Sequence, residues 1–143
     1  MKKLGWTFFA AALTIMATDF VIHGWIMKST YQATAHLWRP EAEMPQYMVW
    51  MFGGQLLTAL LFTWIFSYGY QGKGWMEGVR YGLLIGAFEA GHQMMMYAVS
   101  PYDMTLLMSW IFWGVLQTVV VGVVAAWVWG KWWTGTSPTA SHA

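Results

Sequence analysis

Four long apolar runs, separated by short polar connections, dominate the pattern of the chain. They cover approximately residues 4–27, 46–66, 77–99 and 104–129. Each run is long enough for a helix to cross a hydrocarbon layer about 30 Å thick, which takes about 20 residues. The sequence therefore predicts an all-α fold, an integral membrane four-helix bundle over residues 1–133, followed by a flexible polar tail over residues 134–143.

The polar connections carry residues that end helices. Residues 28–45 contain two prolines, and residues 68–74 contain three glycines. Pro101 follows the third run, and Asp103 stands where an aspartate caps the N-terminus of the next helix. The predicted helices therefore have well-marked boundaries.

The first run begins after two lysines, as a signal peptide does. It is longer than the roughly 7–15 apolar residues of a signal peptide, and Asp19 interrupts it. We therefore expect this segment to be a retained transmembrane helix.

The composition agrees with a multi-pass membrane protein. Hydrophobic residues make up 58% and charged residues 9% of the chain, whereas soluble proteins contain roughly 25% charged residues. A net charge of +1 without a basic cluster argues against a nucleic-acid partner. The absence of cysteine excludes disulfides and thiol catalysis. No phosphate-binding loop, nucleophile elbow or zinc-protease motif is present, so a non-enzymatic protein is the leading expectation.

Cationic residues predict that both termini are cytoplasmic. With the N-terminus inside, five fall on the inner side and two on the outer side, in agreement with the positive-inside rule. The inner five are Lys2, Lys3, Lys73, Arg80 and Lys131, and the outer two are Lys28 and Arg39. The 12 tryptophans gather toward the predicted interfaces, as aromatic belts do.

Polar side chains inside three of the runs form the candidate site. Asp19 and His23 are four residues apart and share a helix face. A rise of about 1.5 Å per residue places the polar residues of the other runs at a similar depth. An unpaired charge at the bilayer centre costs at least about 2.5–3.5 kcal/mol, so these groups should seek each other. The sequence predicts a buried cluster of Asp19, His23, Gln55, Glu89, His92 and Gln93.

Small residues at four-residue spacing indicate where helices approach closely. The third run has Gly82 and Gly86 on the stripe that carries Glu89, and the fourth has Gly114, Thr118 and Gly122. Such stripes let helix backbones come together in lipid. Glu89 is therefore expected on a packing face.

A parallel 2+2 pseudo-repeat is a further hypothesis. The first and third runs each carry an acid followed by a histidine. In the second run Gln55 precedes Trp64 by nine residues, and in the fourth Gln117 precedes Trp127 by ten. Both halves start on the same side, so the pseudo-axis would follow the membrane normal.

The polar cluster leaves several functions open. The leading interpretation is a structural carboxylate–histidine network in a homo-oligomer or an accessory subunit of a membrane complex, without a cofactor. A single metal ion on Asp19, His23, Glu89 and His92 is an alternative. A b-type haem between His23 and His92 is another, and a proton path through Glu89 is a third. Methionines of the outer half, together with His36, would suit Cu(I).

The second half of the chain carries a resemblance. Residues 78–86, 97–101 and 110–114, with Gln117 and Gly122, resemble a group of small four-helix bacterial membrane proteins of unknown function. The resemblance covers about half the chain and rests on glycines, a proline turn and one glutamine. It implies four helices, a lipid-bilayer environment and a bacterial cytoplasmic (inner) membrane location, and it implies no activity.

Overall fold

The computed structural model describes residues 2–131, and within that range the chain is all-helical, without strands. The predicted flexible tail over residues 134–143 lies outside the described residues. The elements in chain order are α1 (Lys2–Val21), a π-helical segment η1 (Ile22–Ile26), α2 (Lys28–Ala33), the 3₁₀ turns η2 (Ala35–Leu37) and η3 (Glu41–Glu43), α3 (Met44–Gly69), α4 (Trp75–Val99) and α5 (Met104–Lys131).

Among residues 2–131, three helical segments are long and apolar enough to cross a membrane: Lys2–Ile26, Glu41–Gly69 and Met104–Lys131. The prediction of an all-helical protein is thereby confirmed, and it contains helices that are long and apolar enough to cross a membrane. α4 is 25 residues long but is not among the three. Its polar residues Glu89, His92 and Gln93 lower its mean hydropathy, so its crossing of the membrane stays a prediction.

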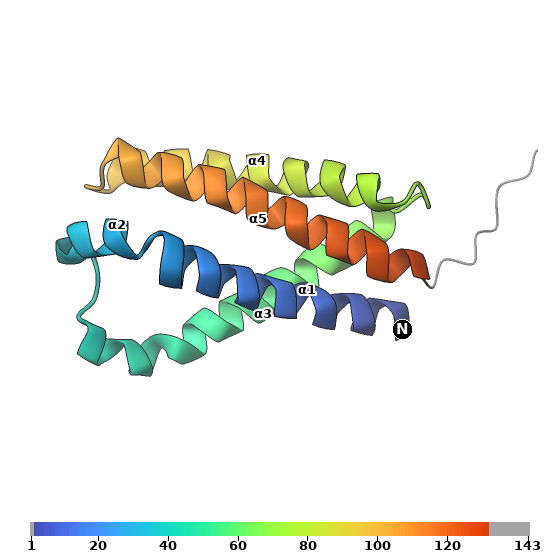
Figure 1. The fold of residues 1–143 in the computed structure, drawn as a ribbon, viewed down its shortest axis with the longest axis horizontal. Helices are drawn as coiled ribbons and strands as arrows, with labels where there is room; N and C mark the ends of the chain where they lie inside the picture. The colour runs from blue at the N-terminus through green and yellow to red at the C-terminus, as the bar shows by residue number, and fades with distance from the viewer. Residues whose placement is uncertain (1, 132–143) are drawn as a thin grey trace, which may run out of the picture.

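The long helices are unequally packed. Figure 1 shows α4 and α5 side by side along most of their length, with α1 against α5. α3 crosses α1 obliquely, and its Met44 end diverges from the other helices. The buried residues of α3 accordingly begin only at Ala59, so its first half lies outside the packed core.

A glycine seam joins α4 to α5. A Cβ atom built on Gly78 would overlap the carbonyl oxygen of Gly122, and one built on Gly82 would overlap that of Thr118. Only glycine permits this backbone approach, so the predicted close contact of the two small-residue stripes is confirmed at these positions. The prediction is wrong for Gly114, since a Cβ atom there would meet nothing within 4 Å.

Two apolar cores lie one above the other along the bundle. One joins Ala11, Ile15, Ala59, Phe62 and Val121 with their neighbours from α1, α3 and α5. The other joins Ile22 and Met27 to Leu106. In α1 and α5 the polar residues Asp19 and Gln117 fall between the two cores in sequence. The candidate site is therefore a polar layer held between two apolar ones.

Side-chain hydrogen bonds hold the backbone at the start of two of the long helices. The Glu77 carboxylate accepts hydrogen bonds from the backbone N–H groups of Gln71 and Lys73, at 2.7 and 2.8 Å. Asp103 Oδ1 accepts one from the Leu106 N–H at 2.8 Å, which confirms the predicted N-cap. These bonds set where α4 and α5 begin.

The outer surface of the bundle is apolar. Large side chains such as Phe20, Trp25, Trp50, Phe88 and Val99 are each more than three-quarters exposed, at 77–79%. Exposed apolar area on this scale marks a surface that meets lipid or another protein.

We expect Gly82→Ala to destabilise the protein, because its methyl group would collide with the α5 backbone. Overpacking of this kind costs about 1–3 kcal/mol. The matched control is Gly91→Ala on the same helix, where a Cβ atom meets nothing within 4 Å. This control should leave stability unchanged or raise it by up to about 1 kcal/mol. Unfolding in detergent measures both, and equal effects would contradict the seam.

Candidate functional site

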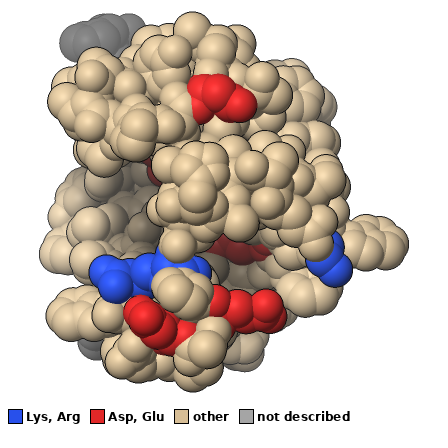
Figure 2. Space-filling view, turned by 90° about the vertical axis from the view of Figure 1, so that its left-hand side faces the viewer, with Lys and Arg blue, Asp and Glu red and all other residues tan. Residues whose placement is uncertain are grey.

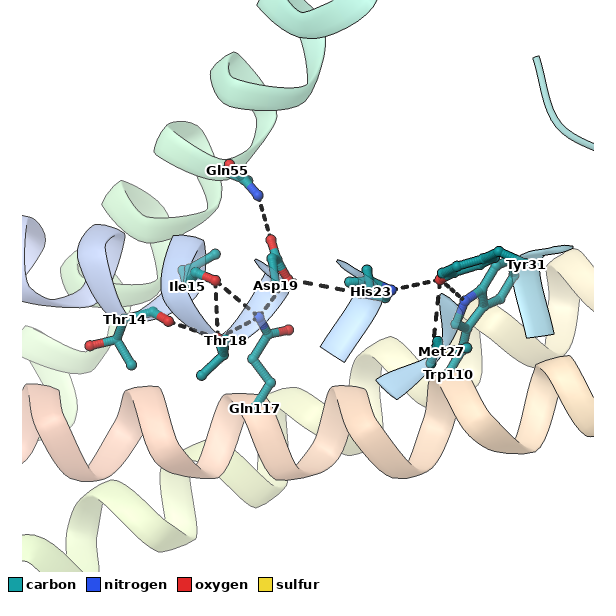
Figure 3. Close-up of polar contacts among 10 residues, drawn as sticks. All are labelled: Thr14, Ile15, Thr18, Asp19, His23, Met27, Tyr31, Gln55, Trp110 and Gln117. Carbon is teal, nitrogen blue, oxygen red and sulfur yellow. Dashed lines mark hydrogen bonds and ion pairs between the residues drawn. The ribbon is translucent and has the colours of Figure 1, made fainter. Parts of the chain in front are cut away.

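Asp19 is the centre of the polar layer (Figure 3). Its Oδ2 accepts a hydrogen bond from Gln55 Nε2 of α3 at 2.5 Å, and its Oδ1 accepts one from Gln117 Nε2 of α5 at 2.6 Å. Hydrogen bonds to a charged acceptor are shorter and stronger than neutral ones. One carboxylate of α1 therefore ties α1, α3 and α5 together.

A side chain and a backbone carbonyl of α1 also hold the Gln117 amide. It donates to Thr18 Oγ1 at 2.8 Å and to the Ile15 carbonyl oxygen at 3.4 Å. The Thr18 hydroxyl donates in turn to the Thr14 carbonyl at 2.7 Å, which leaves its oxygen free to accept from Gln117. This arrangement fixes both the register and the orientation of the amide.

His23 extends the layer toward α2. It lies in the π-helical segment η1, with Nε2 3.9 Å from Asp19 Oδ1 and Nδ1 2.6 Å from the Tyr31 hydroxyl. Trp110 Nε1 donates to the Tyr31 oxygen at 2.9 Å. The hydroxyl proton is then available for His23 Nδ1, since the Met27 sulfur is a weak acceptor at 3.9 Å. A neutral His23 ring in this arrangement carries its proton on Nε2, facing Asp19.

Tyr31 remains a neutral hydroxyl in this chain of contacts. Burial raises the pKa of its phenol, the hydrogen bond from Trp110 lowers it, and the Asp19 charge raises it further. The net direction is upward from an ordinary value of about 10. Tyr31 therefore acts as a hydrogen-bond donor at neutral pH and not as a charged group.

Glu89 of α4 lies beside the network without joining it. It lines a cavity of about 160 Å³ with Asp19, Gln55 and Gln117, and a second cavity of about 280 Å³ with His23 and Tyr31. Within residues 2–131 no hydrogen bond or ion pair holds its carboxylate. Two ionised carboxylates around one small cavity repel each other.

The last two residues of the predicted cluster, Gln93 and His92, line different cavities. Gln93 lines the 280 Å³ cavity, but His92 is exposed and lines a different one of about 650 Å³, together with His36 and Met96. The structure thus brings Asp19, His23 and Gln55 into direct contact and places Glu89 and Gln93 in adjoining cavities. It does not place His92 with them.

The angular spacing on α4 explains why His92 is apart. At about 100° per residue, Gln93 lies about 20° around the helix from the seam residue Gly86, and Glu89 about 60°. His92 lies about 120° away on the same scale and points outward from the seam. The sector predicted from sequence was too broad.

Three residues of the site were missing from the predicted cluster: Gln117, Tyr31 and Trp110. A signal for Gln117 existed, because the pseudo-repeat hypothesis paired it with Gln55, and both amides donate to Asp19. Nothing in the local pattern indicated that Tyr31 and Trp110, 79 residues apart, would meet.

The residues present do not fit a haem, and the described residues offer no metal site of the usual composition. Among residues 2–131 no group of three or more His, Asp or Glu side chains could hold a metal ion. Both ring nitrogens of His23 face protein groups, and His92 lines a separate cavity, so the two do not make an axial pair. Of the methionines considered for copper, Met96 lines a cavity with His36, whereas Met27 is buried in the second core.

No protein-family model, no curated protein and no solved structure matches this chain.

We expect Gln117→Leu to lower the free energy of unfolding by about 1.5–3 kcal/mol, since it removes a donor from a charged acceptor. The matched control is Gln46→Leu, because Gln46 is exposed at the start of α3. This control should leave the free energy of unfolding nearly unchanged. Denaturation of both variants in detergent gives the comparison, and equal stability of Gln117→Leu and the wild type would rule out the network as a structural element.

Proposed function

We propose that this protein is a non-enzymatic, four-span membrane protein with both termini in the cytoplasm. It resides in a bacterial inner membrane and works as a homo-oligomer or as an accessory subunit of a larger membrane complex. The observation that carries the proposal is the double amide hold on Asp19 by Gln55 and Gln117. This carboxylate is engaged by its own chain and serves to lock three spans together.

The completeness of the Asp19 contacts supports a structural role. A carboxylate that acts on a substrate needs an oxygen within reach of the reacting group. Each Asp19 oxygen already accepts a short hydrogen bond, and His23 lies beside one of them. The arrangement stabilises the ionised form and engages both oxygens within the chain.

The first half of α3 supports the assembly part of the proposal. Val49 and Trp50 are 70% and 78% exposed, and Cβ atoms built on Gly53 and Gly54 meet nothing within 4 Å. A helix with small residues on an open face can receive another helix closely in lipid. The chain itself provides no such neighbour within the described residues.

A second candidate function is the handling of a proton or another small cation. It is supported by Glu89, whose carboxylate has no partner among residues 2–131 and borders two cavities. An ionisable group of this kind inside a membrane marks the path of an ion or substrate more often than a structural contact. This candidate uses Glu89 and leaves the structural role of Asp19 unchanged.

The four-span topology can be tested with single cysteines, because the natural chain has none. We expect Lys73→Cys to react with a membrane-impermeant maleimide only from the cytoplasmic side. Lys28→Cys and Ser100→Cys should react only from the opposite side. The comparison of Lys73→Cys with Ser100→Cys decides whether α4 crosses, since labelling of both from one side would leave three spans.

The assembly can be tested by native mass spectrometry of protein released from native membranes. We expect the wild type to carry more than one polypeptide. Asp19→Asn should reduce the assembled fraction, because the charge that attracts both amides is lost; hydrogen bonds to charged groups contribute about 1.5–3 kcal/mol. Glu41→Asn is the control at an exposed site. A wild type that is a single chain at every concentration, with no co-purifying protein, would contradict the proposal.

A further inference from the structure

The two cavities beside Glu89 adjoin each other in the bundle. Glu89 and Gln117 line both the inner cavity of about 160 Å³ and the outer cavity of about 280 Å³. Figure 2 looks onto the end of the molecule that carries α2, and acidic atoms are visible deep in a recess there. Glu89, on both cavities, and Asp19, on the inner one, give the joined space two carboxylates.

The inner cavity is lined by the carboxylates of Asp19 and Glu89 and by no lysine or arginine among residues 2–131. The Asp19 charge forces the Gln55 amide to turn its Nε2 toward the carboxylate, and the Gln55 Oε1 is left buried without a partner. An unpaired buried acceptor costs about 1–3 kcal/mol. Glu89 adds a second carboxylate, and among residues 2–131 no lysine or arginine forms an ion pair with it. A ligand that satisfies this cavity is positively charged and carries N–H donors.

The outer cavity is aromatic and pre-organised. Tyr31, Trp110 and Trp113 line it. Trp110 is held by its hydrogen bond to Tyr31 and by an edge contact with Tyr102 at 5.1 Å between ring centroids. Aromatic faces attract organic cations, whereas metal ions such as Ca²⁺ and Mg²⁺ require several oxygen ligands. The wall therefore favours an organic ammonium over a metal cation.

Small residues keep the outer cavity open. Gly86, Ala90 and Gly114 line it, and a Cβ atom on Gly114 meets nothing within 4 Å. The absent side chain at Gly114 is not needed for helix packing, in contrast to the glycines of the seam. This position opens toward the cavity and allows a steric test.

We propose that Glu89 and the aromatic wall bind a small primary ammonium compound. Its ammonium group pairs with Glu89, and its apolar body lies against Trp110. This inference rests on the second candidate function, in which Glu89 handles a cation, and it names the class of cation.

The probe is butylammonium chloride, measured by titration calorimetry on the full chain in lipid nanodiscs, with empty nanodiscs as blank. We expect saturable binding by the wild type and none of 1-butanol, which lacks the charge. Glu89→Gln should weaken binding by at least about tenfold, since an ion pair and charge-assisted hydrogen bonds are lost. Glu41→Gln, at an exposed site outside both cavities, should bind as the wild type does.

Gly114→Leu is the second variant, because it fills the outer cavity while leaving every polar group in place. It should abolish binding, and an unchanged unfolding temperature would show that the fold survives. The proposal is overturned if Glu89→Gln binds as tightly as the wild type, if Gly114→Leu does, or if sodium chloride at equal concentration displaces the probe. Binding in nanodiscs without uptake of the amine into vesicles would support this site and contradict only the cation-handling function.

Discussion

The structure depends on one constraint: the Asp19 carboxylate lies in a segment apolar enough to cross a membrane, and it needs hydrogen-bond donors there. Two glutamine amides supply them from α3 and α5. An amide is suited to this task because it donates without adding charge, whereas a lysine would have to be desolvated as well. Three helices are thereby tied at one level by neutral groups around a single acid.

The apolar packing on either side makes that polar contact specific. Below it, Ala11, Ala59 and Ala125 allow α1, α3 and α5 to approach closely, and all three are fully buried. Above it, Leu106 packs against Ile22 and Met27. The two cores fix the register of the helices. The amides of Gln55 and Gln117 are therefore placed opposite Asp19. The glycine seam between α4 and α5 does not involve Asp19. The molecule therefore consists of a closely packed α4–α5 hairpin and of α1 and α3, which are joined to it through Asp19.

Much of the local structure can be predicted from the sequence, but less of the candidate site can. Helix existence, the Asp103 cap and the α4–α5 stripe follow from run length, turn residues and four-residue spacing, all of which are local properties. The Asp19–His23 pair follows from the same spacing. The Tyr31–Trp110 contact depends on the π-helical segment η1 and on the path of α2, which no local pattern specifies. The prediction for His92 is wrong because the seam sets which face of α4 turns inward, and Gln93 and Glu89 lie closer to that face than His92 does.

The contrast between the two acids of the bundle separates architecture from function. Asp19 has a donor on each oxygen, so its own chain accounts for its presence in an apolar segment. Glu89 is on the adjoining helix, borders the same cavity and has no donor among residues 2–131. A carboxylate whose presence is not explained by intramolecular contacts needs a proton or a cation from outside the chain. Tyr31, Trp110 and Trp113 line the cavity beside Glu89, so a cation bound there contacts an aromatic surface. The Glu89 charge alone attracts any cation, whereas the aromatic surface favours an organic one.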